Sequence, residues 1–244
     1  SDQHSFPTRR SSDLNGIMAS DAPEKSSIAI GLIPNGIGND FADYWGLTLD
    51  YKVAVDWIIN NRKKKIDVGI CSYYNGKSHE KRYFLNAVNI GLGARIVSIT
   101  DQTKRFWGVK FLSYVAALFL LFFERKLYRS HLKINDEHIR GRIMTVCVGS
   151  AKGYGQTPSA VPYNGWLDVS VIHRPELLQL VWGLWMLIEG RILNHKMVKS
   201  YRTKKVRVLR AKNASVDLDG RLLPKHFPID IGIIPEAITL IIPN

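Results

Sequence analysis

The sequence predicts an α+β fold, in which a partial α/β unit is followed by a β-sandwich. Two observations carry this prediction. The first 60 residues contain one β-type run, a glycine-rich turn and two helical patterns. Beyond residue 127, seven short apolar or alternating runs are separated by polar turns, with one helical pattern among them. We expect the first unit to cover residues 15–66 and the β-rich unit residues 67–244, with the last strands packing back on the first unit.

The first 14 residues are expected to be foreign to the fold. The tract from His4 to Leu14 resembles the translation of a widely used sequencing adapter, and its Ser, Arg and Pro content is typical of a disordered basic tail. We therefore expect residues 1–14 to be disordered and the native sequence to begin near Asn15.

A glycine-rich stretch from Pro34 to Ala42 follows the β-type run Ile28–Ile33 and opens a helical pattern. The backbone amides of such a loop, together with the helix N-terminus, can approach a phosphate closely. Asn39 or Asp40 could cap the helix, since both side chains accept from backbone N–H groups. A plain structural turn is the competing interpretation.

Helices are expected at about 41–45 and at 51–60, the second with an apolar face. Two strands, Ile66–Cys71 and Tyr83–Val88, flank Asn75-Gly76, a pair typical of a type I′ hairpin. The seven later strands are expected at 130–135, 142–148, 167–172, 204–209, 215–218, 229–233 and 238–242.

Two apolar helices are expected within the β-rich unit. The first, Phe111–Phe123, would span about 20 Å at ~1.5 Å per residue, too short for the ~30 Å core of a bilayer. It is either a buried core helix or, given its basic flanks, a lipid-facing helix. The second helix, Pro175–Leu193, carries Trp182, Trp185, Met186 and Leu187 on its apolar side.

The charge balance favours anionic partners. The chain has 34 Lys and Arg against 21 Asp and Glu, a net charge of +13, which favours a membrane surface, nucleotide phosphates or nucleic acid. Its aromatic residues lie in apolar runs and are not interleaved with Arg and Lys, which argues against nucleic acid. Cys71 and Cys147 lie far apart in apolar runs, which predicts buried free thiols in a reducing compartment.

Two carboxylates, Asp217 and Asp219, end a strand pattern two residues apart, so on a strand they point to the same face. Such a pair could hold Mg²⁺ or deprotonate a hydroxyl. An ordinary Asp-Gly turn is the alternative at this position.

Several motifs occur in an order that resembles the diacylglycerol kinase and sphingosine kinase family of lipid kinases. They are Pro34 to Ala42, Tyr83-Phe84-Leu85-Asn86, the stretch Val148 to Gly155 with its Gly-Tyr-Gly loop, Asn164 to Asp168, and Asp219-Gly220. The resemblance implies a nucleotide-binding α/β domain related to NAD kinase, followed by a β-sandwich, with the active site in the cleft between them.

The resemblance also implies roles for individual residues. Asp219 would activate the hydroxyl of diacylglycerol or a related lipid for attack on the γ-phosphate of ATP. Asn15-Gly16-Ile17-Met18 resembles the tail of the family's Gly-Gly-Asp-Gly-Thr segment, so we expect the chain as given to lack the main ATP-phosphate loop. The remaining phosphate contacts would come from Gly36, Ile37, Gly38, Asn39 and Asp40.

Four departures from the family pattern fall on functional positions. Ile37 stands in place of Thr, and Gly93 in place of Asp. Arg221 replaces a Glu and is permanently protonated, so it cannot act as a base. Tyr163 and Asn164 replace two acids of a segment that binds a structural Mg²⁺ in bacterial members. Asp168 is the retained candidate ligand, and the two lost charges weaken such a site.

The expected function is ATP-dependent phosphorylation of a lipid hydroxyl, with Mg²⁺, by a cytoplasmic protein peripheral to the inner face of the membrane. The expected partners are the lipid substrate and an anionic membrane surface; a homodimer is left open and nucleic acid is not expected. One alternative is a catalytically inactive protein of the same fold that binds or regulates at lipid surfaces. Another is a nucleotide kinase of the NAD kinase type, whose acceptor is soluble.

Overall fold

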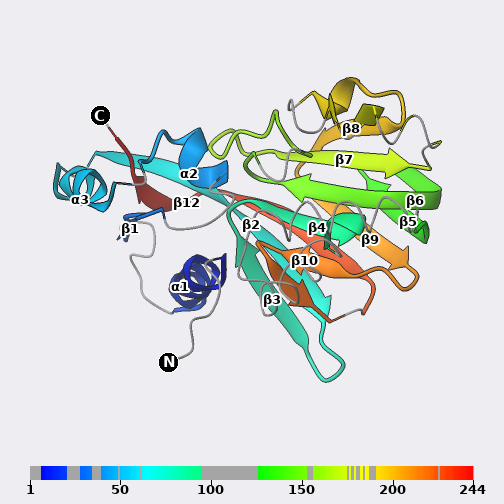
Figure 1. Ribbon diagram of the computed structural model, residues 1–244. Coiled ribbons are helices and arrows are strands. Elements are labelled where there is room, and N and C mark those ends of the chain that lie inside the picture. Colours follow the sequence, from blue (N-terminus) through cyan, green and yellow to red (C-terminus); the bar gives the residue numbers. More distant parts are fainter. Residues whose placement is uncertain are drawn as a thin grey trace, which may run out of the picture.

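The structure is a computed structural model. Its fold is built around one large curled sheet (Figure 1). The structure describes residues 7–20, 28–34, 40–48, 50–60, 62–94, 126–152, 156–174, 191–224 and 226–243, with residues 176, 179, 182, 183, 185 and 186. The predicted helix Phe111–Phe123 and the glycine-rich loop 35–39 lie outside the described residues. No helix within the described ranges is long and apolar enough to cross a bilayer.

The elements of the first part of the chain are short, apart from two helices and a long strand. They are α1 (Pro7–Ala19), β1 (Ala29–Ile30), α2 (Asp40–Tyr44), α3 (Tyr51–Asn60), β2 (Lys63–Tyr74), β3 (His79–Phe84) and β4 (Ala87–Gly91). The expected helices at 41–45 and 51–60 are therefore confirmed, and β2 runs continuously across the expected domain boundary at residue 66.

The remainder is predominantly β-structure. Its elements are β5 (Tyr128–Ile134), β6 (Glu137–Gly149), β7 (Leu167–His173), the 3₁₀ turn η2 (Ile192–Asn194), β8 (Val198–Thr203), β9 (Lys205–Ala211), β10 (Val216–Leu218), β11 (Arg221–Leu223) and β12 (Ile229–Ile241). The seven expected later strands are confirmed, with the last two joined into β12 through a bulge between Ile234 and Ile238. β8 and β11 were not expected.

The strands are ordered β11-β10-β4-β6-β5-β9-β12-β2-β3, while β7 and β8 branch from β6 and β1 pairs with β12. β6 is the branch point of the sheet, because its first half pairs with β5 and its second half with β4 and β7. The main core contains side chains from strands on both sides of this branch point, among them Leu132, Val171 and Ile231. β12 pairs with β1 in parallel and with β2 in antiparallel orientation, so the chain's last strand joins its first.

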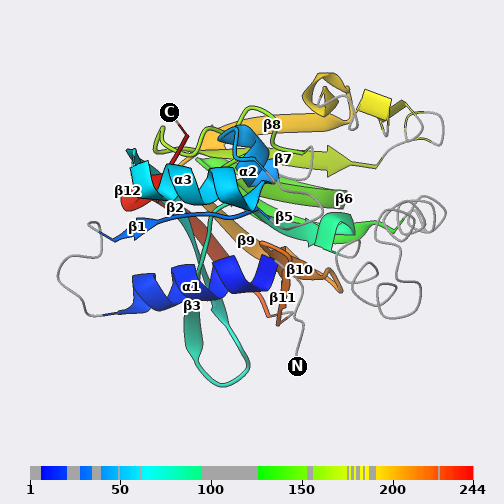
Figure 2. The same cartoon turned by 60° about the vertical axis from the view of Figure 1, so that its left-hand side comes forward.

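Helix α1 lies beside β3 (Figures 1 and 2). Leu14 is buried, and the amide of Asn15 both donates to the carbonyl of Tyr83 at 3.0 Å and accepts from its N–H at 2.9 Å. The expected disorder of residues 1–14 therefore does not hold for residues 7–14, which belong to α1. The adapter origin of this tract stays a prediction.

Two local expectations were wrong. The hairpin between β2 and β3 has a four-residue loop, in which Asn75 Oδ1 accepts from the N–H groups of Lys77 and Ser78, at 2.7 and 2.8 Å. Only Gly76 has a positive φ there, so the turn is not type I′. The single strand expected over 83–88 is instead two strands, β3 and β4, which separate at Leu85-Asn86.

Candidate functional site

Asp219 lies in a two-residue turn between β10 and β11. Both turn residues have positive φ, 48° for Asp219 and 86° for Gly220, and Leu218 pairs with Arg221 across the turn. This is the backbone that an Asp-Gly type I′ hairpin requires. The tight turn brings the Asp219 side chain, which is 2% exposed, against the start of β4.

The carboxylate of Asp219 caps the break between β3 and β4. Its Oδ2 accepts from the Leu85 N–H at 2.8 Å, and its Oδ1 accepts from the N–H groups of Asn86 and Ala87, each at 3.0 Å. Successive N–H groups of a regular strand point to alternate sides, whereas these three point to one carboxylate. The backbone therefore cannot continue as a strand here, and the carboxylate supplies the acceptors that a neighbouring strand would otherwise provide. The predicted catalytic carboxylate therefore also has a structural role.

The carbonyl groups of the break at Leu85-Asn86 are held by the segment that follows β6. Ser150 Oγ donates to the Leu85 carbonyl at 2.9 Å, and the Ser150 N–H donates to the Asn86 carbonyl at 2.9 Å. Asn86 Oδ1 is buried without a hydrogen-bond partner among the described residues. Three separate sequence motifs, at 84–86, 149–151 and 219–220, thus meet at one point.

A second hydrophobic cluster connects this point to the predicted nucleotide loop. Phe41, the second residue of α2, is buried in the same cluster as Leu85 and Ala151. Helix α2 begins at Asp40, immediately after the predicted loop residues Gly36 to Asn39. Those loop residues and the side chain of Asp40 lie outside the described part of the structure, so their phosphate-binding role stays a prediction.

Asp67 was missed by the sequence reasoning. It is 1% exposed on β2, where its Oδ2 accepts from the Gly165 N–H at 2.6 Å and its Oδ1 from the Glu236 N–H at 2.9 Å. Glu236 sits in the β12 bulge with a φ of 49°. The carboxylate thereby ties the 163–168 loop to that bulge. An acid inside the apolar run 66–71 was the available signal, because buried acids need partners.

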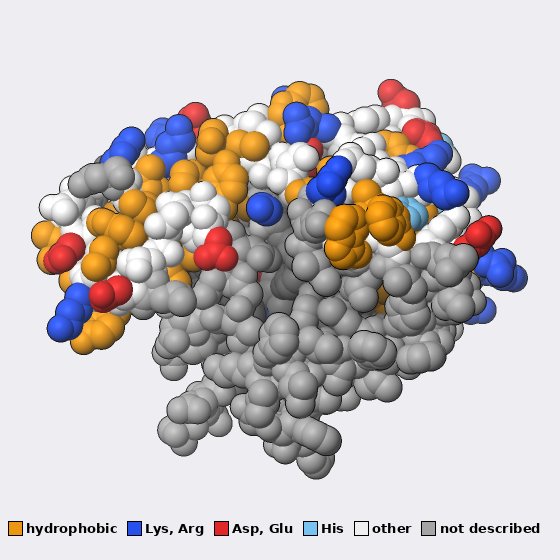
Figure 3. Space-filling model, turned by 45° about the horizontal axis from the view of Figure 1, so that its top comes forward, with side chains coloured by type: hydrophobic (Ala, Val, Ile, Leu, Met, Phe, Trp, Pro, Cys, Tyr) orange, Lys and Arg blue, Asp and Glu red, His pale blue; other side chains and the backbone are white. Residues whose placement is uncertain are grey.

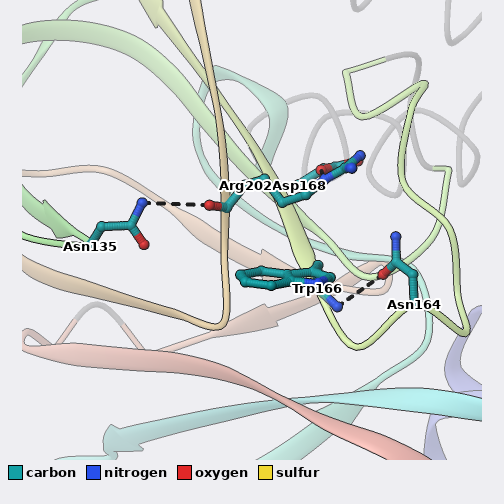
Figure 4. Close-up of polar contacts among 5 residues, drawn as sticks. All are labelled: Asn135, Asn164, Trp166, Asp168 and Arg202. Atoms are coloured by element: carbon teal, nitrogen blue, oxygen red, sulfur yellow. Dashed lines mark hydrogen bonds and ion pairs between the residues drawn. The ribbon is translucent and has the colours of Figure 1, made fainter.

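Asp168, the predicted metal ligand, is paired with an arginine. Its two oxygens face the Arg202 guanidinium, with Nε to Oδ1 at 2.8 Å and Nη2 to Oδ2 at 3.3 Å (Figure 4). The two residues oppose each other across β7 and β8. This bidentate geometry occupies the carboxylate that a metal would need.

The rest of the 163–168 loop is also arranged around protein cations. Lys64 Nζ lies 4.7 Å from the ring centroid of Tyr163, and Lys204 Nζ lies 5.0 Å from that of Trp166. No cluster of three or more His, Cys, Asp or Glu side chains that could hold a metal occurs among the described residues. The residues present therefore do not fit a structural Mg²⁺, and the predicted metal role of Asp168 is not supported by this geometry.

Gly93 lies just beyond the end of β4, against the buried polar side chains of Asn89 and Gln156. A Cβ atom there would lie 3.2 Å from Asn89 Cβ and 3.2 Å from Gln156 Nε2. Asn89 also donates to Asp217 Oδ2 at 3.2 Å. Asp217 on β10 thus contacts Asn89, whereas Asp219 lies in the turn beyond β10 and contacts residues 85–87, so the two carboxylates do not stand together on one strand.

Both cysteines are buried and free, as predicted. Burial raises the pKa of the Cys71 thiol to about 12, with a smaller contribution from the charge of Asp230. Burial likewise raises the pKa of the Cys147 thiol to about 12, although a hydrogen bond with Thr157 opposes the shift. Neither thiol is suited to act as a nucleophile near neutral pH.

Two family models match the chain. The YegS C-terminal NAD kinase beta sandwich-like domain matches residues 86–242, and the diacylglycerol kinase catalytic domain matches residues 12–71. The chain belongs to the YegS and diacylglycerol kinase family. The β-sandwich and the NAD kinase-like character predicted from the sequence are confirmed by these matches.

Individual relatives agree with this assignment. A Pseudomonas syringae pv. tomato protein named "Probable lipid kinase YegS-like" is 28% identical over 83% of this chain and 63% of its own length. A Staphylococcus carnosus "Diacylglycerol kinase" is 24% identical over 88% of this chain and 69% of its own. The chain thus spans 63% of the first relative.

The fold is also found among solved structures. A crystal structure of a diacylglycerol kinase from Bacillus anthracis aligns with a TM-score of 0.58 at 16% identity, covering 88% of this chain and 67% of that one. Identity at this level supports a shared fold and carries no statement about activity.

Proposed function

We propose that the protein to which this chain belongs transfers the γ-phosphoryl group of ATP to a hydroxyl of diacylglycerol or a related lipid. The observation that carries the proposal is the meeting of three family motifs at the turn held by Asp219. The relatives' names, which include diacylglycerol kinase, give the same substrate class. Phosphoryl transfer depends mainly on positioning and charge neutralisation, so a rigid turn is a suitable support.

In this proposal Gly36, Ile37, Gly38, Asn39 and Asp40 hold the phosphates of ATP. Asp219 is the group that accepts the proton of the lipid hydroxyl, because the neighbouring Arg221 cannot act as a base. The N–H bonds from residues 85–87 fix the orientation of its carboxylate. Mg²⁺, when bound with ATP, neutralises phosphate charge. Asp168 takes no part, since Arg202 occupies it.

A second candidate is a catalytically inactive protein of the same fold that binds at lipid surfaces. The observation that favours it is the engagement of the Asp219 carboxylate by three backbone N–H groups, combined with Arg221 in place of the family's Glu. In both candidates the net charge of +13 supports a peripheral position at an anionic, cytoplasmic membrane face.

The test is transfer of ³²P from labelled ATP to diacylglycerol in mixed detergent micelles, with the full-length gene product. Labelled lipid that depends on Asp219 supports the kinase. No transfer by the wild type, and none after Arg221→Glu, supports the inactive candidate. Phosphorylation of a soluble nucleotide without micelles would instead indicate a nucleotide kinase.

A further inference from the structure

Two tryptophans protrude from the helical segment that covers the β7 and β8 side of the sheet. Trp182 and Trp185 are 57% and 46% exposed, and their ring centroids are 4.9 Å apart. The sequence predicts both on the apolar side of this helix, together with Met186. The structure exposes both indoles, whereas Gly183 and Met186 are buried.

Close packing beneath the segment explains this orientation. A Cβ on Gly183 would lie 2.6 Å from Met197 Cε, so a larger residue would fit there only if the Met197 side chain moved. Met186 packs with Met144, Ile172 and Ile192 in a cluster of its own. Residues three apart share a face of a helix, so burying 183 and 186 turns 182 and 185 outward.

Three exposed cations, Arg191, Lys196 and Lys199, lie in the segment that follows the indole pair. The Arg191 N–H donates to the Met186 carbonyl at 2.8 Å, and the ring of His195, next to Lys196, lies 3.9 Å from the position of a Cβ on Gly183. In the space-filling view, protruding hydrophobic side chains stand beside Lys and Arg side chains (Figure 3). We call Trp182, Trp185, Arg191, Lys196 and Lys199 the tryptophan patch. The sequence from 176 to 199 also contains two acids, Glu176 and Glu189.

We propose that the tryptophan patch is the surface by which this protein docks on an anionic lipid bilayer. Exposed indoles concentrate at the membrane–water interface, where one part of the ring is apolar and the N–H end remains hydrated. The three cations match the negative surface potential of an anionic leaflet. This inference rests on the proposed lipid substrate and names the face that meets the membrane.

The patch is joined to the candidate catalytic turn by one strand. β4 begins at Ala87, whose N–H is held by Asp219, and Leu92 just beyond its end packs against the cluster beneath the tryptophans. Five residues of strand cover roughly 17 Å at 3.3–3.4 Å per residue. One strand of the sheet therefore links the packing beneath the patch to the turn held by Asp219.

A second basic surface provides the matched control. On the outer face of β5 and β6, Arg129 opposes Arg142, His131 opposes Arg140 and Lys133 opposes His138. This face has comparable positive charge but no exposed tryptophan among its described residues. If charge alone determined binding, this face would bind an anionic bilayer as well as the patch does.

The experiment measures binding of the full chain to vesicles of phosphatidylcholine with about 30% phosphatidylglycerol, without diacylglycerol or ATP. The double variant Trp182→Ala, Trp185→Ala should bind at least tenfold more weakly. The triple variant Arg191→Gln, Lys196→Gln, Lys199→Gln should lose about 100-fold in affinity. Lys133→Gln, Arg140→Gln, Arg142→Gln, the control, should lose less than about threefold. Brominated lipid should quench the wild type's fluorescence and leave that of the Trp double variant unchanged.

Three results would overturn the proposal. They are wild-type binding by both patch variants, loss of binding in the β5–β6 control alone, and no binding of the wild type to anionic vesicles. A wild type that binds RNA in preference to vesicles would point to a polyanion surface instead. Because the vesicles contain no substrate, each of these results leaves the kinase assay in detergent micelles to decide the proposed function separately.

Discussion

The hydrogen bonds of Asp219 predict a large stability cost for Asp219→Asn. An asparagine tolerates the positive φ of 48° at this position as aspartate does, so the exchange isolates the side-chain contacts. With its oxygen at the Oδ1 position, the amide keeps the bonds from Asn86 and Ala87. Its NH₂ group would then face the Leu85 N–H, which now bonds to Oδ2 at 2.8 Å.

The magnitude follows from these contacts. One buried donor is left without an acceptor, which costs about 1–3 kcal/mol, and two bonds lose their charged acceptor. We expect a total loss of about 2–4 kcal/mol in the free energy of unfolding, which corresponds to roughly 5–15 °C in Tm for a chain of this size.

The assay is thermal and urea unfolding followed by circular dichroism. Asp136→Asn, the same exchange at an exposed turn position, serves as the control and should change the free energy of unfolding by less than about 0.5 kcal/mol. An Asp219→Asn protein within about 0.5 kcal/mol of the wild type would refute the assignment of three N–H bonds to this carboxylate.

Three further predictions follow from contacts elsewhere. Burial raises the pKa of the Cys71 and Cys147 thiols to about 12 from 9.0, so as the pH rises these thiols lose their protons in the unfolded chain before they do in the folded chain. The free energy of unfolding should therefore be unaffected by the thiols below about pH 9 and fall as the pH rises from there towards 12. This fall should be smaller when both are replaced by Ala, and Tyr44, whose pKa burial raises to about 12, contributes to the remainder. Gly69→Ala places a Cβ against the Phe84 ring and should lower the free energy of unfolding, measured in urea, by about 1–3 kcal/mol. An unchanged free energy of unfolding would contradict this packing. Since Arg202 occupies Asp168, neither EDTA nor millimolar Mg²⁺ should shift the Tm by more than about 1 °C, whereas a metal-dependent rise of several degrees would show that the loop holds an ion after all.

Regular elements were predictable where local pattern and tertiary packing agree. The helix 51–60 has a clear apolar face and matches α3 residue for residue. The seven later strands follow from their alternation, which the sandwich core preserves. The hairpin loop at Asn75 was not predictable from the Asn-Gly pair, because the Asn75 side chain bonds to Lys77 and Ser78 and stabilises a longer loop.

The candidate site was predictable only in part, because its members come from distant segments. The Asp-Gly turn at 219–220 was readable as a turn, but its bonds to residues more than 130 positions earlier were not. The same holds for Asp67, whose partners are Gly165 and Glu236. The exposure of Trp182 and Trp185 was not predictable, because apolar periodicity does not say which residues of an apolar helix reach solvent.

We place the turn held by Asp219 in a lipid kinase site. The most direct measurement is the rate of ³²P transfer from ATP to diacylglycerol by the full-length protein and its Asp219→Asn variant, at a temperature where circular dichroism shows both to be folded. We expect labelled lipid with the wild type and a rate at least about 100-fold lower with the variant. Equal rates in the two proteins, or no labelled lipid with the wild type, would contradict this assignment.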